Sequence, residues 1–227
     1  MSLYLYINIA IIFFPLLLTF EKRIKYYSKI KNLTVAILLI SYLFVAWDIF
    51  ATFRGHWSFN PNYVLEIKFL GIPIEEVLFF ITVPFSCLFA YEGIKYYFKD
   101  SKLFSINKLI PNSIGILFLA LAFVSIGGEY TTLALASMGF TIIFISNFMI
   151  ELFFSKLFWI YIAFTILVFL IFNYLLTSIP VVEYSSLAII GFRVITIPIE
   201  DFMFNFSMLT LYLAVYLWSS KRRYSRN

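Results

Sequence analysis

The chain has 227 residues, of which 63% are hydrophobic and 13% are charged, and its mean hydropathy is +0.95. This balance excludes an ordinary water-soluble domain, which carries about twice that share of charged residues. The net charge of +5 does not indicate nucleic-acid binding, because the basic residues lie beside the ends of apolar segments and form no separate patch.

Apolar segments recur along the whole chain, each about as long as a helix needs to cross roughly 30 Å of hydrocarbon. We expect seven transmembrane helices, at Leu3–Phe20, Leu33–Thr52, Ile72–Tyr91, Ile110–Ile126, Thr131–Ile150, Leu157–Thr177 and Ile197–Trp218. The predicted fold is therefore an all-α polytopic membrane protein that forms a single domain over residues 1–227.

The positive charges are distributed unequally between the two sides of the predicted bilayer. Fourteen of the 17 Lys and Arg residues fall on one side, in Glu21–Lys31, Lys95–Lys108, Lys156 and Lys221–Arg226. Only Arg54, Lys68 and Arg193 fall on the other side. The positive-inside rule then predicts an integral protein of the cytoplasmic membrane, with its N-terminus outside and its C-terminus in the cytoplasm.

One tetrapeptide occurs twice, as Pro73-Ile74-Glu75-Glu76 and, 125 positions later, as Pro198-Ile199-Glu200-Asp201. At the same spacing Asp48 matches Asn173, Phe59 matches Tyr184 and Lys68 matches Arg193. We interpret this as a duplicated three-helix unit, with repeat 1 at residues 1–102, a connecting helix within 103–127 and repeat 2 at 128–227. A single connecting helix makes the two repeats run parallel through the membrane, so the acidic pairs lie at equal depth and can converge.

The candidate catalytic residues are Glu75, Glu76, Glu200 and Asp201. An ionisable group at bilayer depth is disfavoured by roughly 2.5–3.5 kcal/mol and so indicates function. We expect each proline at the first helical position, which places the acids in the first turn, where the helix dipole favours carboxylates. Four neighbouring acids in a low dielectric cannot all ionise, so the cluster should hold the proton that a general acid needs. The first candidates are Glu75 and Glu200, and helix capping is the alternative role.

Other polar and aromatic residues lie near the acidic pairs. The candidate supporting polar groups are Asp48, Asn173, Lys68 and Arg193. The candidate substrate-binding residues are Trp47, Trp57, Phe59 and Tyr184. Two alternatives stand beside these roles, because Lys and Arg also anchor helices at lipid headgroups and aromatic residues also form interfacial belts.

Three segments resemble the membrane-integral lycopene cyclase domain family: Gly71–Phe80, Asn173–Tyr184 and Gly191–Phe202. The resemblance extends over nearly the whole chain, including the organisation of three helices, one helix and three helices. The chain is similar to the fused form of an enzyme that some bacteria make as two small subunits. The chain departs from strict duplication at Asn205, which occupies the position that matches Phe80.

The resemblance implies a carotenoid cyclase, an isomerase that protonates a terminal double bond of a linear carotenoid such as lycopene and later removes a proton from the new ring. We expect no cofactor, because the reaction is redox-neutral and the chain has no G-x-G-x-x-G motif for a flavin. We expect no metal site, since the chain has one cysteine, Cys87, and one histidine, His56. Membrane lipid and other carotenoid enzymes are the remaining candidate partners.

A proton-coupled transporter with parallel repeats is the alternative function, because buried acids also serve as proton relays. It is disfavoured by the lack of matched Gly or Pro breaks within corresponding helices, since Pro84 is matched by Leu209.

Overall fold

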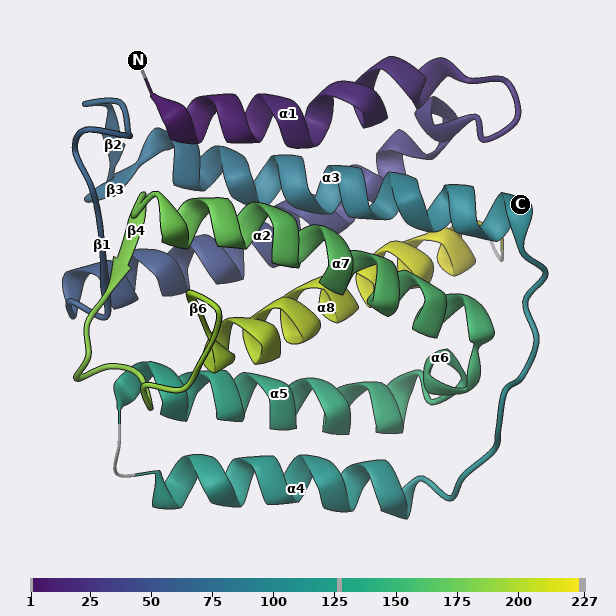
Figure 1. Cartoon of the computed structure of the whole chain (residues 1–227). Coiled ribbons are helices and arrows are strands. Elements are labelled where there is room, and N and C mark those ends of the chain that lie inside the picture. Colours follow the sequence, from purple (N-terminus) through teal and green to yellow (C-terminus); the bar gives the residue numbers. More distant parts are fainter. Residues whose placement is uncertain (1, 126–127, 225–227) are drawn as a thin grey trace.

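The computed structural model describes residues 2–125 and 128–224 (Figure 1). The long helices are α1 (Leu3–Leu17), α2 (Ile30–Phe53), α3 (Ile74–Tyr97), α4 (Leu109–Val124), α5 (Glu129–Phe148), α7 (Lys156–Ser178) and α8 (Ile199–Tyr224). Between them lie the short helices η1 (Leu18–Phe20), η2 (Tyr26–Lys29) and α6 (Glu151–Phe154). The strands are β1 (Trp57–Phe59), β2 (Lys68–Phe69), β3 (Ile72–Pro73), β4 (Val182–Tyr184), β5 (Arg193–Val194) and β6 (Ile197–Pro198).

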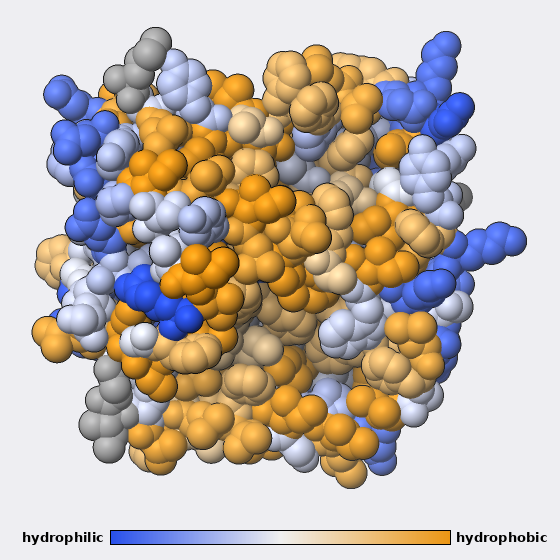
Figure 2. All heavy atoms as spheres, in the orientation of Figure 1, coloured by the Kyte–Doolittle hydropathy of each residue, from blue (hydrophilic) through white to orange (hydrophobic). Residues whose placement is uncertain are grey.

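The long helices lie side by side, and every strand is at the same end of the bundle, which we name the hairpin end (Figure 1). The loops that carry most of the basic residues lie at the opposite end, which we name the basic end. Figure 2 shows hydrophilic residues gathered at these two ends and a broad hydrophobic surface between them. This distribution is the one expected for a bundle embedded in a bilayer.

Six helical segments in the described residues are long and apolar enough to cross a membrane: Leu3–Phe20, Tyr26–Phe53, Ile74–Tyr97, Glu129–Phe148, Lys156–Ser178 and Ile199–Lys221. The predicted all-α membrane protein is thereby confirmed, but α4 is a shorter apolar helix and the seventh crossing stays a prediction. Three positions named in the predictions lie outside the described residues: Ile126 and residue 127, at the end of the predicted connecting segment, and Arg226 of the basic tail.

Helix α4 packs against α5 at one edge of the bundle, where small residues bring the two backbones close together (Figure 1). A Cβ atom added at Gly115 would lie 2.9 Å from the carbonyl oxygen of Gly139, and one added at Gly139 would lie 2.7 Å from that of Gly115. Small residues permit such close approach between helices within a membrane. Asn147 also donates a hydrogen bond to Asn112 over 2.9 Å.

Each of the two loops before α3 and α8 folds into a tight hairpin that the sequence analysis did not predict. Lys68 pairs with Pro73 in the first hairpin and Arg193 with Pro198 in the second. Both prolines are therefore in strands and directly precede their helices, so the prediction of proline at the first helical position is wrong by one residue. The acids nevertheless lie in the first helical turn, as predicted.

The two loops also pair with each other through β1 and β4. In this antiparallel ladder Trp57 faces Tyr184, Ser58 faces Glu183 and Phe59 faces Val182. Ser58 and Glu183 are 125 positions apart. The ladder is therefore centred on two residues that the repeat spacing predicts to be equivalent.

The bundle should lie in the membrane with its hairpin end outside, because the basic end carries most of the Lys and Arg residues. Asn62 is exposed at the hairpin end, Ser105 is exposed in the loop between α3 and α4, and the native Cys87 is buried. An Asn62→Cys protein should react with a membrane-impermeant maleimide in intact cells, whereas a Ser105→Cys protein should react only after the cells are opened. The reverse labelling pattern would contradict this orientation.

Candidate functional site

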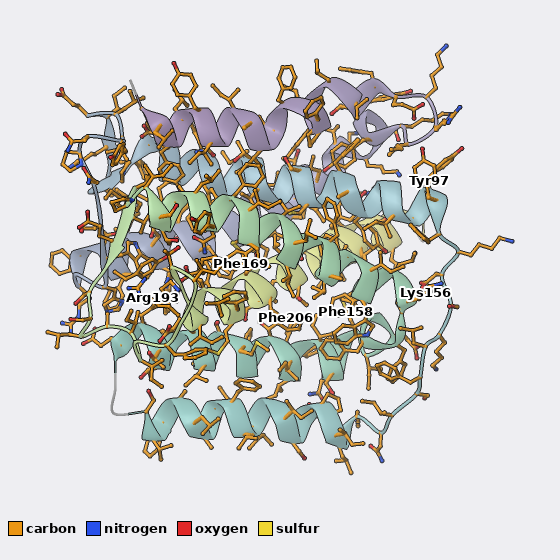
Figure 3. All side chains as sticks on the ribbon, in the orientation of Figure 1. Tyr97, Lys156, Phe158, Phe169, Arg193 and Phe206 are labelled. Atoms are coloured by element: carbon orange, nitrogen blue, oxygen red, sulfur yellow. The ribbon has the colours of Figure 1, made fainter. Side chains whose placement is uncertain are left out.

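A cavity of about 580 Å³ lies inside the bundle, lined mainly by apolar side chains. Helices α1, α3, α7 and α8 supply most of its wall, and the hairpin-end loops supply Trp57, Phe59 and Tyr184. Phe169, one of its lining residues, comes from α7, while Arg193 marks the hairpin end (Figure 3). Tyr97 and Lys156 lie at the opposite end (Figure 3).

The cavity is elongated along the helices. Its wall includes both Glu76, in the first turn of α3, and Ile94, near the end of the same helix. At a rise of 1.5 Å per residue these two positions are about 27 Å apart. Phe14 of α1 and Phe164 of α7 line the cavity and are also exposed on the outer surface. The cavity therefore runs through much of the bundle and reaches the surface that faces lipid.

The hairpin end of the cavity is polar, and two carboxyl groups from different halves of the chain lie there. Glu76 accepts a hydrogen bond of 2.5 Å from the Tyr4 hydroxyl. Asp201 accepts hydrogen bonds from Tyr130 over 2.6 Å and from Tyr184 over 2.8 Å. All five residues line the cavity, and the charges of Glu76 and Asp201 interact with each other. The acids of the two helix starts thus meet in one apolar space.

Asp48 and Asn173 stand beside these two acids. Asn173 donates a hydrogen bond of 2.9 Å to Asp201. Asp48 is only 2% exposed, and one of its oxygens accepts a 2.8 Å bond from the Trp57 indole. Among the described residues its second oxygen has no hydrogen-bond partner, and its charge interacts with that of Glu76. Both residues line the cavity, so three carboxyl groups share its polar end.

Glu75 and Glu200 have a different position, because neither lines the cavity and both are fully buried. Glu75 accepts a 2.7 Å hydrogen bond from the backbone N–H of Leu65, and Glu200 accepts one of 2.7 Å from that of Ile190. The same oxygen of each carboxyl group also accepts a hydroxyl, from Ser2 on Glu75 and from Thr131 on Glu200. Each acid therefore joins its preceding loop to the start of α1 or α5.

Three aromatic rings cover the polar end of the cavity. The Trp57 and Tyr130 ring centroids are 5.0 Å apart, and the Tyr130 and Tyr184 rings stack with centroids 6.0 Å apart. Burial raises the pKa of the Tyr184 hydroxyl well above its ordinary value, so this group remains a hydrogen-bond donor at neutral pH. Aromatic faces attract cations, and these rings suit a site where positive charge develops.

A family model described as lycopene cyclase matches two segments of the chain, residues 1–94 and 129–219. These segments cover most of the chain. The chain belongs to the lycopene cyclase family. No curated protein and no solved structure matched it.

Membership of the lycopene cyclase family confirms the resemblance inferred from the acidic motifs and supports a role in carotenoid cyclisation. It does not favour the proton-coupled transporter. The two matched segments also leave out the stretch between them, which contains α4. Helix α4 thus lies wholly outside the matched segments, as do only the last residues of α3 and α8 among the other long helices.

The structure gathers most, but not all, of the residues that the sequence analysis predicted for the site. The predicted residues that line the cavity are Asp48, Trp57, Phe59, Glu76, Asn173, Tyr184 and Asp201. Trp47 does not line it and packs near Ala51 and Trp57. Lys68 and Arg193 are exposed on the hairpins and do not line it either. Arg193 donates to the Thr196 carbonyl over 2.7 Å and lies 5.8 Å from the Tyr184 ring centroid.

The two tyrosines that donate to the cavity acids, Tyr4 and Tyr130, were not among the predicted site residues. They are 126 positions apart, one more than the spacing of the acidic motifs, so a gap-free comparison of the halves does not match them. The serine and threonine that contact Glu75 and Glu200 are further out of register, at positions 2 and 131. A comparison that allows a one-residue gap would match the two tyrosines, but not the serine and threonine as well, because Ser2 precedes Tyr4 whereas Thr131 follows Tyr130.

The structure predicts that Glu75 and Glu200 contribute strongly to stability. Replacing either by alanine leaves a partly buried backbone N–H, of Leu65 or of Ile190, without its acceptor, at roughly 1–3 kcal/mol for each unsatisfied donor. Replacing Glu200 also removes the acceptor of the Thr131 hydroxyl, whereas the Ser2 hydroxyl keeps the Tyr63 carbonyl. The Glu75→Ala and Glu200→Ala proteins should therefore melt at clearly lower temperatures in detergent. Glu66→Ala, at an exposed residue of the first of these loops, should melt like the unaltered protein. Equal melting of all four proteins would contradict the anchoring role.

Proposed function

We propose that this protein closes rings at the ends of a linear carotenoid such as lycopene, as a redox-neutral isomerase. The observation that carries the proposal is the meeting of Glu76 and Asp201 at the polar end of one long apolar cavity. A proton-initiated cyclisation needs an acid, a base and a site that excludes water from the cation. The buried carboxyl groups and the apolar wall supply these three requirements.

The proposal includes duplication of a parallel three-helix unit, with α1–α3 equivalent to α5, α7 and α8. Several details recur at the spacing of 125: the hairpin registers, the left-handed Leu70 and Ile195, and the backbone bonds to Glu75 and Glu200. Helix α1 contacts α3 as α5 contacts α8. The first repeat then covers residues 1–102 and the second covers residues 128–227. Helix α4 belongs to the connecting segment, and the whole chain forms one membrane domain.

The reaction begins when a protonated carboxyl group at the polar end protonates the terminal double bond. The resulting tertiary cation is attacked by a second double bond of the same chain, which forms the ring and moves the charge onto a ring carbon. Loss of a neighbouring proton to a carboxylate then gives the neutral product. Each ring gains one proton and loses one, so no oxidant or reductant is needed. Aromatic rings face the positive charge and stabilise it, namely those of Trp57, Tyr130 and Tyr184.

The position of the cavity suits a long apolar substrate that is dissolved in lipid. Between exposed Phe14 of α1 and Phe164 of α7, the polyene enters sideways from the bilayer. One end of the substrate then lies against Glu76 and Asp201, while the rest extends along α3 toward Ile94. In the orientation given by the positive-inside rule, the reacting end lies toward the outer face of the cytoplasmic membrane.

The test is expression in a bacterium that accumulates lycopene, followed by chromatography of the pigments. The unaltered protein should convert lycopene into cyclic carotenoids, whereas Glu76→Gln and Asp201→Asn should lose about 10²–10⁴-fold of the rate per protein molecule. Because Glu75 and Glu200 lie outside the cavity, Glu75→Gln and Glu200→Gln should act mainly through protein stability and retain more activity per folded molecule.

The matched control is Glu66→Gln, which also removes one carboxylate from the hairpin end and should cyclise normally. No cyclic pigment from the unaltered protein, although it is present in the membrane, would contradict the proposed function. Full activity of both Glu76→Gln and Asp201→Asn would instead contradict the roles of these acids.

The chemistry also predicts that activity needs no added cofactor. Purified protein in lipid vesicles, prepared without flavin and treated with a metal chelator, should cyclise lycopene at the rate of untreated vesicles. A loss of activity that returns on adding a flavin or a divalent metal would contradict the redox-neutral, acid-catalysed mechanism.

A further inference from the structure

We propose that the two halves of the cavity divide the proton chemistry: Asp48 and Glu76 hold the proton that starts the reaction, and Asp201 is the carboxylate that receives the proton at its end. This inference rests on the proposed function and adds Asp48 to the reacting groups. It assigns the roles of donor and acceptor, which family membership and the acidic motifs leave open.

The environment of Asp201 stabilises its ionised form. Three donors converge on its two oxygens: Tyr130 over 2.6 Å, Asn173 over 2.9 Å and Tyr184 over 2.8 Å. Hydrogen bonds to the charged form of an acid favour that form. Asp201 has the largest number of such donors among the three acids of the cavity, so the negative charge resides there.

The environment of Asp48 and Glu76 is poorer in donors. Within the part of the chain that the structure describes, Asp48 accepts one bond, from Trp57, and its second oxygen is buried without a partner. Glu76 accepts one bond, from Tyr4. A buried oxygen that lacks a donor is a costly place for negative charge. Since the charges of these two acids also interact, the pair retains a proton between them.

The difference between the halves depends on two matched positions, because the spacing of 125 pairs Asp48 with Asn173 and Phe59 with the donor Tyr184. In the second half the amide of Asn173 donates to Asp201 and stabilises an anion. In the first half the carboxyl group of Asp48 stands beside Glu76, where it adds a proton site. Two differences, Asp against Asn and Phe against Tyr, therefore make the two sides of the cavity chemically unequal.

The proton follows a balanced path in this arrangement. An O–H bond of the Asp48–Glu76 pair breaks as a C–H bond forms at the less substituted carbon of the terminal double bond, which leaves the tertiary cation on the other carbon. After ring closure, a C–H bond next to the cation breaks and its proton goes to Asp201. Return of that proton to the first pair, directly or through exchange with water, restores the starting state.

The first experiment exchanges the matched residues and measures lycopene cyclisation in membrane vesicles per molecule of folded protein. Asp48→Asn should lose at least 10²-fold of the rate, because it removes the extra proton site. Asn173→Asp should also be slower, since it replaces a donor to Asp201 by a second acid. The double variant Asp48→Asn with Asn173→Asp moves the acid pair to the other half. Its rate should be at least tenfold higher than the rate expected from multiplying the losses of the two single variants.

Two results of this exchange would overturn the division of roles: full activity of Asp48→Asn, or a double variant whose effects simply multiply. The proposed function is judged separately, because it fails only if the unaltered protein makes no cyclic product. Glu66→Gln again serves as the control for a lost carboxylate at the hairpin end, and it should leave the rate unchanged.

A second experiment uses milder variants and reads the position of the new double bond. The ring cation can lose a proton from any of its neighbouring carbons, so the mixture of ring isomers reports on the base. Tyr184→Phe removes a donor from Asp201 and should change this mixture, whereas Tyr4→Phe should slow the reaction and leave the mixture unchanged. The division of roles is wrong if both variants alter the mixture alike, or if Tyr4→Phe alone alters it.

Discussion

The structure depends on the burial of carboxyl groups at two matching helix starts inside an apolar bundle. Such groups are expensive to remove from water, and they persist only where hydrogen bonds replace the lost hydration. Glu75 and Glu200 obtain these bonds from loop N–H groups, which the hairpins before α3 and α8 fold back toward the helices. The loops are therefore folded around the acids, and the acids hold the loops over the end of the bundle.

This arrangement assigns different work to neighbouring residues of each acidic pair. The first acid of each pair accepts a hydrogen bond from a backbone N–H of the preceding loop. The second acid faces the cavity, where it accepts hydrogen bonds from tyrosine hydroxyls. The β1–β4 ladder joins the two loops, so Trp57 from one loop stands against Tyr184 from the other. The polar end of the cavity is thus built from both halves of the chain, and neither half contains a complete site.

Much of the fold and part of the site could be predicted from the sequence. Helix positions follow from apolar length, and the duplicated acidic motif identifies Glu76, Asp201, Asp48 and Asn173 as one set. The motif could not tell Glu75 from Glu76, because both are in the first turn and only the folded loop shows which one meets a backbone N–H. The hairpins escaped prediction as well, since each strand has two residues and no alternating pattern. Tyr4 and Tyr130 were missed because their spacing differs by one residue from that of the motif.

The central claim is that a carboxyl group in the shared cavity supplies the proton that starts ring closure. The most direct measurement equilibrates the protein in D₂O, adds lycopene for a single turnover and locates deuterium in the product by mass spectrometry and NMR. The account predicts one deuterium per ring, on the carbon that was protonated in the terminal double bond. A cyclic product without deuterium at that carbon would contradict the account.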